Sequence, residues 1–201
     1  MKGQQRGQMI VLSGPSGVGK STVIAELLGA RPEMYFSISF TTRPPRAGEE
    51  NGINYHFVDR PRFEEMILRE ELLEYAEYVH NYYGTSLKIL EEKLEQGIDV
   101  LLDIEVQGAA EVKRKCPEAV LIFIVPPSFE ELSRRLQGRN SDGEAAVHAR
   151  LVTAREEYRE IPKYDYLVLN DKVSHAVEEI MAILTAESCR TENRMHLIEG
   201  V

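Results

Sequence analysis

The segment that most constrains this chain is a glycine-rich stretch that follows a short apolar run near its N-terminus. The apolar run is Met9–Leu12, and the stretch reads Ser13-Gly14-Pro15-Ser16-Gly17-Val18-Gly19-Lys20-Ser21-Thr22. Within it, a glycine pair five residues apart, followed by Lys and Ser, fits the P-loop pattern. Apolar residues then recur with helical spacing from Val23 to Leu28. A strand, a glycine turn and a helix in this order predict a site where backbone N–H groups and the helix N-terminus bind phosphate.

Two side chains of this motif have specific chemistry with a nucleoside triphosphate. Lys20 can reach the terminal phosphates as a point charge, and the Ser21 hydroxyl can bind Mg²⁺. The motif therefore predicts a site for the phosphates of ATP or GTP, but it does not identify the acceptor of a phosphoryl group. The residues expected around the phosphates are Gly14, Pro15, Ser16, Gly17, Val18, Gly19, Lys20, Ser21 and Thr22.

The size and charge of the chain exclude several classes of protein. A chain of 201 residues predicts one α/β domain, or one core with small insertions. Its net charge of −9 argues against binding DNA or RNA through their phosphate backbones, which requires a basic surface. Residues 1–8 lack the apolar core of a signal peptide, no run reaches transmembrane length, and the two cysteines have no metal-ligand spacing. We therefore expect a cytoplasmic protein with reduced thiols and no nucleic-acid or membrane partner.

Apolar runs predict the strands of the core. Four of them are typical of buried parallel strands: Met9–Leu12, Ile98–Ile104, Val120–Val125 and Tyr166–Leu169. A fifth, Tyr35–Phe40, alternates apolar residues with serine and predicts a strand with one polar face. Because helical stretches lie between these runs, we expect a parallel five-stranded sheet with helices on both faces. The ligand crevice should lie at the carboxyl ends of the strands.

Local signals predict where several helices begin and end. An apolar stripe at residues 87–94 should end at Gly97, which is typical of a helix C-cap. Capping boxes, each with Glu three residues further on, predict helix starts at Ser128 and Ser141. A stripe at residues 177–184 predicts another helix that faces the core.

Two segments interrupt this alternation of strands and helices. The first, residues 37–86, is rich in Arg, Glu, Gly and Tyr and predicts an inserted substrate module of mixed α and β structure. The second, residues 138–150, is polar, lies between two predicted helices and is typical of a mobile lid. The expected organisation is a P-loop core formed by residues 1–36 and 87–201, which contains the lid, and the inserted module at residues 37–86.

The inserted module carries two arginines in a stiff context, Thr41-Thr42-Arg43-Pro44-Pro45-Arg46. The prolines restrict the backbone between two guanidinium groups, and arginine is suited to binding phosphate through two parallel hydrogen bonds. Next to a P-loop, such a pair predicts a clamp for a second phosphate. Without the P-loop, a surface ion pair would be the simpler interpretation. Glu74 and Tyr83 are less specific, because single residues of these types are usually solvated or packing residues.

The order of separated motifs resembles the guanylate kinase family across nearly the whole chain. After the P-loop come Ser39-Phe40-Thr41-Thr42-Arg43-Pro44-Pro45-Arg46-Ala47-Gly48-Glu49, Gly52-Ile53-Asn54-Tyr55, Tyr82-Tyr83-Gly84-Thr85 and Leu102-Asp103-Ile104-Glu105-Val106-Gln107-Gly108. The likeness ends with Pro126-Pro127-Ser128, Arg139 and Val168-Leu169-Asn170-Asp171. It implies Mg²⁺-dependent phosphorylation of GMP or dGMP by ATP, with a GMP-binding inserted module and a lid on the ATP side.

On the acceptor side, the resemblance implies contacts with GMP for a set of polar residues. Those expected at the GMP phosphate are Ser39, Arg43, Arg46, Tyr55 and Tyr83, with Glu49 in the same site. Those expected at the guanine edge are Glu74, Thr85 and Glu105. The family more often has Asp at position 105. Glu105 could therefore contact the guanine, pair with an arginine, or only place a negative charge at a helix N-terminus.

On the donor side, the resemblance implies roles in metal binding and charge stabilisation. Asp103 would belong to the Mg²⁺ shell, partly through water, together with Ser21, and would also brace the acceptor-side arginines. Asn170 would lie near the adenine. The residues expected to stabilise charge during transfer are Lys20, Arg43, Arg135, Arg139 and Arg150.

The chemistry of a carboxylate at Glu74 agrees with guanine as the base. Guanine presents its N1–H and its 2-amino group as adjacent donors, and one carboxylate can accept from both. Adenine has no proton on N1 and no 2-amino group, so it would leave the charge of Glu74 unmatched. Sites built on buried hydrogen bonds reject analogues that lack the partner by on the order of 10⁴-fold. The residues thus predict selection of guanine over adenine.

Two functions of other kinds stay open at this point. A non-catalytic module of the same family that binds proteins would commonly have a degraded P-loop and lie in a longer chain. A related P-loop kinase with a phosphorylated sugar as acceptor would lack a guanine-reading pair such as Glu74 and Thr85. Both GMP and dGMP as acceptors, and both a monomer and a homodimer, are compatible with the sequence.

Overall fold

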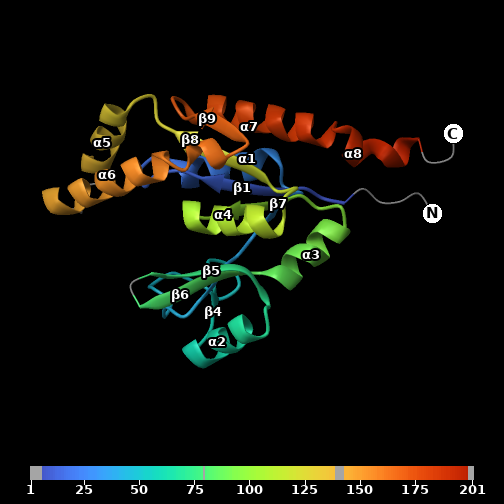
Figure 1. Cartoon of the computed structure of the whole chain (residues 1–201). Helices are drawn as coiled ribbons and strands as arrows, with labels where there is room; N and C mark the ends of the chain where they lie inside the picture. Colours follow the sequence, from blue (N-terminus) through green and yellow to red (C-terminus); the bar gives the residue numbers. More distant parts are fainter. Residues whose placement is uncertain (1–5, 79, 139–142, 199–201) are drawn as a thin grey trace.

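The computed structural model describes residues 6–78, 80–138 and 143–198, and Figure 1 shows how its layers are arranged. Its centre is a parallel five-stranded sheet in the order β2-β7-β1-β8-β9. The strands in that order are Tyr35–Phe36, Val100–Asp103, Met9–Ser13, Val120–Val125 and Tyr166–Leu169. The predicted parallel sheet is confirmed. Because β1 is the middle strand, the P-loop that follows it leaves the centre of the carboxyl edge.

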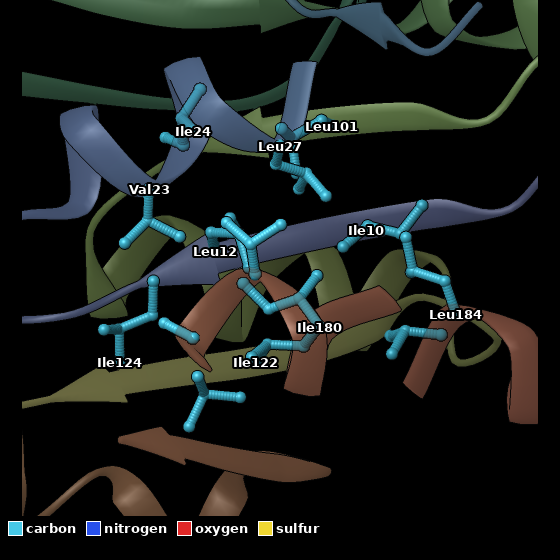
Figure 2. Close-up of a cluster of buried hydrophobic side chains, with 14 of the residues drawn as sticks. Ile10, Leu12, Val23, Ile24, Leu27, Leu101, Ile122, Ile124, Ile180 and Leu184 are labelled. Atoms are coloured by element: carbon cyan, nitrogen blue, oxygen red, sulfur yellow. The ribbon is translucent and has the colours of Figure 1, made fainter. Parts of the chain in front are cut away.

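One face of the sheet is covered by two helices. Ile10 and Leu12 of β1 pack there against α1 (Lys20–Ala30) and α7 (Val173–Ser188), whose inward stripes include Leu27 and Ile180. Figure 2 shows these side chains meeting between the sheet and the two helices. The stripe predicted at residues 177–184 is therefore the core face of α7.

The opposite face of the sheet packs against different helices. Met9 and Val11, which alternate with Ile10 and Leu12 along β1, lie in a second cluster with residues of α3 (Leu87–Glu95) and α4 (Val106–Lys115). Successive side chains of a strand point to opposite faces, so one apolar run supplies both clusters. The helices on both faces confirm the predicted α/β class.

A second, four-stranded sheet is built from the inserted residues, in the order β4-β3-β6-β5. Its strands are β3 (Phe40–Thr41), β4 (His56–Phe57), β5 (Leu72–Tyr78) and β6 (Asn81–Ser86). The pair β3–β4 is parallel and the other pairs are antiparallel. The helix α2 (Arg60–Leu68) packs on this sheet through Phe63 and Met66. The mixed α and β structure expected of the insertion is present.

The single strand predicted at Tyr35–Phe40 is wrong. Tyr35 and Phe36 pair with β7 at the edge of the core sheet, whereas Phe40 and Thr41 pair with β4 and β6 of the second sheet. The apolar alternation continues through the point where the chain leaves one sheet for the other. Alternation of apolar and polar residues along a segment predicts an extended backbone. It does not predict which other strand that segment pairs with.

Helix ends follow local chemistry at two of the predicted positions. Gly97 has a φ of +74°, and its N–H donates to the carbonyl of Leu94 at 3.0 Å, so α3 ends as predicted. Ser128 is the N-cap of α5 (Phe129–Gln137), and its hydroxyl accepts from the N–H of Glu131 at 3.1 Å. The carboxylate of Glu131 turns to Arg134 and Arg135, so the reciprocal half of the predicted capping box is replaced by ion pairs.

The helix start predicted at Ser141 is wrong. Gly143 is the N-cap of α6 (Glu144–Tyr158), and Ser141 lies outside the described residues. The helices α5 and α6 pack together through Leu132, Leu136 and Val147, and Figure 1 shows this pair at one end of the molecule.

The remaining elements are short. They are the 3-10 helices Ile161–Lys163 and Met195–Leu197 and the helix α8 (Thr191–Arg194), which follows α7 near the end of the chain. Within residues 6–78, 80–138 and 143–198, every helix is too short or too polar to cross a membrane.

Candidate active site

The P-loop lies over the N-terminus of α1. Gly19 is the N-cap of this helix and has a φ of +96°, a conformation that favours glycine. A Cβ atom at Gly19 would also come within 2.7 Å of the side-chain nitrogen of Asn170. The helix begins at Lys20, as predicted. Because glycine offers no side chain to cap a helix, Gly19 provides no side-chain cap for the N–H groups of Lys20 and Ser21, and a ligand can bind there.

Lys20 and Asp103 meet at the carboxyl edge of the sheet. The Nζ atom of Lys20 lies 2.8 Å from Oδ1 of Asp103, and the two side chains are 17% and 33% exposed. Leu12 pairs with Asp103 in the β1–β7 register, so the strand before the P-loop and the strand before Asp103 end side by side. Two residues predicted from separate motifs are thus in direct contact. Ser21, the other predicted metal ligand, lies exposed in the first turn of α1, next to Lys20.

Two residues predicted on the ATP side hydrogen-bond the backbone of the P-loop. The side-chain amide of Asn170, which is 3% exposed, donates to the carbonyl of Val18 at 2.7 Å. Arg135 of α5 donates to the same carbonyl at 3.0 Å and to the carbonyl of Asn170 at 3.1 Å. These bonds tie the α5–α6 pair to the P-loop, an arrangement that the sequence did not predict.

Glu131 orients this arginine. Its carboxylate accepts from Nε of Arg135 at 2.8 Å and from Arg134 at 2.8 Å. Hydrogen bonds from Arg134 and then from Arg135 lower the pKa of Glu131 to about 2. The carboxylate is therefore ionised at neutral pH, and it leaves the terminal nitrogens of Arg135 directed at the two carbonyls.

A cleft of about 320 Å³ lies between the end of β7, the start of α4 and the strands of the second sheet. Most of the residues predicted on the GMP side line it. They are Ser39, Tyr55, Glu74, Tyr83, Asp103 and Glu105. Gln107 and Gly108 of α4 also line the cleft, and the sequence assigned neither of them a role. The fold thus brings together side chains from both sheets that are far apart in the chain.

Glu74 and Thr85 form a buried pair beside this cleft. They are opposite each other in the β5–β6 register, and the hydroxyl of Thr85 donates to Oε1 of Glu74 at 2.6 Å. Glu74 is 6% exposed and Thr85 is 1% exposed. Burial raises the pKa of Glu74, while the Thr85 hydrogen bond and the charge of Lys115 lower it. One carboxylate oxygen is thus held by Thr85, and the other is left for the cleft.

Arg43 is held by Glu49 in a bidentate ion pair. Both terminal nitrogens of Arg43 lie 2.9 Å from the carboxylate oxygens of Glu49. The backbone N–H of Arg46 donates to the same carboxylate at 2.7 Å, while the Arg46 side chain is exposed. The hydrogen bond from Arg43 lowers the pKa of Glu49. Glu49 therefore fixes the turn that carries both arginines, which is a positioning contact.

Two tyrosines stand beside Arg43. The guanidinium carbon of Arg43 lies 5.4 Å from the centre of the Tyr55 ring, within the range of a cation–π contact. The rings of Tyr55 and Tyr83 meet edge to face at 6.0 Å. The predicted phosphate-binding residues Arg43, Tyr55 and Tyr83 are thus gathered into one cluster. Its phenol groups and guanidinium supply hydrogen-bond donors that suit an anion.

Glu105 occupies the position that two of its three interpretations require, the guanine contact and the charge at a helix N-terminus. It is the N-cap residue of α4, and it also lines the cleft. Glu157 of α6 is a nearby residue that the sequence did not single out. Burial raises the pKa of Glu157, Glu105 raises it further, and Lys20 lowers it, so Glu157 lies within electrostatic range of both groups. A glutamate on a helix gives no sequence signal of this kind, because it is usually solvated.

The lid arginines are only partly described. Arg139 lies outside the described residues, and Arg150 lies half-buried on α6. Arg135, the third residue of the set, donates a hydrogen bond to the P-loop carbonyl of Val18. Of the predicted lid, residues 138–150, the structure describes Gly138 and residues 143–150, which form the start of α6. The helix α6 packs on α5, whose Arg135 reaches the P-loop.

The fold and the site together define a P-loop α/β protein whose P-loop lysine contacts Asp103, a residue that also lines a cleft between the core and the second sheet. The family model described as guanylate kinase matches residues 6–187. The chain is 52% identical over 191 residues to a guanylate kinase from Thermus thermophilus, covering 95% of this chain and 85% of that relative. It is 46% identical over 198 residues to a guanylate kinase from Desulfitobacterium hafniense, covering 98% and 99% of the two chains.

A solved structure agrees with these matches. The crystal structure of guanylate kinase from Anaplasma phagocytophilum is 36% identical, with a TM-score of 0.76 over 95% of this chain and 91% of that chain. The protein belongs to the guanylate kinase family.

Proposed function

We propose that this protein transfers the γ-phosphoryl group of ATP to GMP or dGMP, giving ADP and GDP or dGDP, as a step of purine nucleotide metabolism and GMP recycling. The observation that carries the proposal is the buried carboxylate of Glu74, which Thr85 holds and which lines the same cleft as Asp103, the ion-pair partner of the P-loop lysine. A carboxylate with one oxygen held by a hydroxyl and the other next to an open cleft suits the adjacent N1–H and 2-amino donors of guanine.

The donor side would act by positioning and charge neutralisation. Backbone N–H groups of the loop Gly14–Ser21 and the N-terminus of α1 would hold the phosphates of ATP, and Lys20 would neutralise their terminal charge. An in-line transfer needs no covalent intermediate on the protein, because alignment and electrostatics supply most of the catalysis in phosphoryl transfer. The bonds from Asn170 and Arg135 to Val18 would keep the loop in its binding conformation.

The residues at the donor site fit a Mg²⁺ ion. Ser21 and Asp103 offer hard oxygen ligands at the carboxyl edge of the sheet, and Asp103 already contacts the P-loop lysine. Within the described residues no group of three or more Asp, Glu, His and Cys could hold a metal. This suits Mg²⁺, which usually keeps waters and phosphate oxygens around one or two protein ligands. When bound with ATP, the ion would neutralise charge on the transferring phosphate.

The inserted module at residues 37–86 would bind the acceptor. Arg43, Arg46, Tyr55, Tyr83 and Ser39 would hold the GMP phosphate, with Glu49 positioning the arginines. Neutralising that dianion would lower its repulsion of the incoming phosphoryl group. Glu105 would approach the guanine from the start of α4, opposite Glu74.

The lid would complete the site from the ATP side. Arg135, Arg139 and Arg150 would stabilise charge on the transferring group after the lid and the inserted module close. Closure would exclude water and so limit hydrolysis of ATP. Asn170 would also lie near the adenine.

We further propose a cytoplasmic location, which the free thiols of Cys116 and Cys189 support.

The other two functions are not favoured. A module that only binds proteins has no need of the paired Lys20 and Asp103 at an intact P-loop. A sugar phosphate would leave the buried carboxylate of Glu74 without donors from a base.

An ADP-release assay with a panel of acceptors tests the proposed function. GMP, dGMP, AMP, UMP and a sugar phosphate are compared at equal concentration, with ATP and Mg²⁺. We expect turnover with GMP and dGMP, much slower turnover with the others, and loss of turnover when the metal is chelated. Equal turnover with AMP and GMP would overturn the role of Glu74 as the residue that reads guanine.

A further inference from the structure

Gly108 of α4 faces the guanine-reading carboxylate at very short range. A Cβ atom at this position would lie 3.1 Å from Oε2 of Glu74 and 3.5 Å from its Cδ. A third contact, 3.6 Å to Cβ of Ile104, is ordinary van der Waals packing. The tight contact therefore involves the one carboxylate oxygen that Thr85 does not hold.

Glu74 has little freedom to move away from position 108. Its Oε1 atom is held by Thr85 at 2.6 Å, and the side chain is 6% exposed. The preceding residue, Leu73, is fully buried in the cluster that contains Ala109 and Val112 of α4. The strand and the helix are thus packed on each other at the level of Gly108, and Figure 1 shows α4 between the core sheet and the β5–β6 pair.

The C-terminal end of α4 is also hydrogen-bonded to β5. The ammonium group of Lys115, the last residue of α4, donates to the carbonyl of Leu73 at 2.5 Å and to that of Leu72 at 3.3 Å. Because β5 is attached to α4 at Leu72 and Leu73, directly before Glu74, the strand is held close to the helix where a side chain at position 108 would enter. The carboxylate itself would have to shift.

Glycine at this position is not favoured by the helix itself. Alanine forms helices better than glycine, and the φ of Gly108 lies outside the range that requires glycine. The benefit of glycine must therefore come from its surroundings, and the surroundings are Glu74 and the cleft.

We propose that Gly108 is a specificity-determining residue, because its missing side chain sets the position of Oε2 of Glu74 for the donors of guanine. This inference rests on the proposed function. It adds that base selection depends on the spacing between α4 and β5, as well as on the carboxylate itself.

The test is the Gly108→Ala variant, assayed for turnover with GMP and AMP and for the KM of ATP. We expect a KM for GMP about tenfold higher, the scale of a weakened hydrogen bond to a charged group, and an unchanged KM for ATP. The preference for GMP over AMP should fall by the same factor. Gly29→Ala is the matched control, because Gly29 is also helical and a Cβ there meets nothing within 4 Å.

A double-mutant cycle separates this role from general packing. In a Glu74→Ala background the added methyl group has no carboxylate to contact, so Gly108→Ala should not change the KM for GMP any further. If Gly108→Ala alone fails to fold, folding of the double variant would support the contact, and failure of both would overturn it. A single variant that folds and keeps the wild-type KM for GMP would also overturn it.

The two proposals fail in different ways. If the unmodified protein does not phosphorylate GMP, the proposed function is wrong. If it does so and Gly108→Ala behaves like Gly29→Ala, only the role of Gly108 is wrong.

Discussion

The Nζ atom of Lys20 lies 2.8 Å from Oδ1 of Asp103, so the P-loop lysine is bound to the carboxylate that ends the neighbouring strand. The contact follows from the sheet, because Leu12 of β1 pairs with Asp103 of β7. In the nucleotide complex, phosphate oxygens would compete with Asp103 for the same ammonium group. The pair therefore holds Lys20 near the place where the terminal phosphates are expected.

We predict that Lys20→Ala lowers kcat by at least about 10²-fold, the scale for removing one charge-stabilising group from a transition state. The fold should persist, because a partly exposed ion pair contributes little to stability. Turnover by ADP release and thermal unfolding are the measurements. Lys88→Ala is the control, since the Lys88 side chain is 83% exposed. A Lys20→Ala protein with near-normal kcat would contradict the donor role.

We predict that Arg43→Met weakens GMP binding by about 2–4 kcal/mol, the scale for losing a charged hydrogen bond from a binding site. Titration calorimetry with GMP measures this directly. Arg69→Met, in the same module, should bind GMP normally, because the Arg69 side chain is 64% exposed and pairs with Glu65. Unchanged affinity in Arg43→Met would remove this arginine from the phosphate clamp.

We predict that Arg135→Lys raises the KM for ATP several-fold and lowers the Tm by about 2–6 °C. Lysine cannot reach the carbonyls of Val18 and Asn170 together while also pairing with Glu131, so about 1–2 kcal/mol of hydrogen bonding is lost. Arg134→Lys is the matched control, since the Arg134 side chain is 75% exposed and pairs with the same Glu131. If the two variants had the same KM for ATP and the same Tm, the contacts of Arg135 with the P-loop would not be needed for ATP binding or for stability.

We predict that Glu74→Gln stabilises the protein at neutral pH and abolishes its preference for GMP. Burial raises the pKa of Glu74 above its value of 4.5 in the unfolded chain, so the folded state disfavours the ionised carboxyl. Glu74 therefore favours the folded state fully below pH 4.5, where its carboxyl is protonated. This stabilisation is lost as the pH rises through the pKa of Glu74 in the folded protein. A glutamine keeps an acceptor for Thr85 without the charge.

Thermal unfolding of wild type and Glu74→Gln across this pH range is the measurement. The Tm advantage of the variant should be present at neutral pH and should vanish below pH 4.5. A Tm difference that does not depend on pH would show that the effect is packing and not ionisation. Turnover with GMP and AMP, measured on the same protein, reports the loss of base selection.

Much of the core is predictable because its signals are local. A continuous apolar run marks a strand buried on both faces, and the run at residues 9–12 does supply both hydrophobic clusters. Gly97 ends its helix because left-handed backbone suits glycine. The two errors arise where a local pattern stays valid but its context changes. The alternation at residues 35–40 crosses from one sheet to the other, and the capping-box pattern predicts a helix start at Ser141 where Gly143 is the N-cap.

By itself, the sequence determined the phosphate chemistry, the class of fold and the set of residues available to an acceptor. Each of these depends on residue type and on spacing within a short segment. Only the tertiary structure decided which residues meet: Lys20 with Asp103, Glu74 with Thr85, and Gly108 with Glu74. These contacts depend on strand order, on register and on how closely α4 approaches β5. Strand order and packing distance are set by the whole chain, because they follow from burying two clusters at once and not from any single segment.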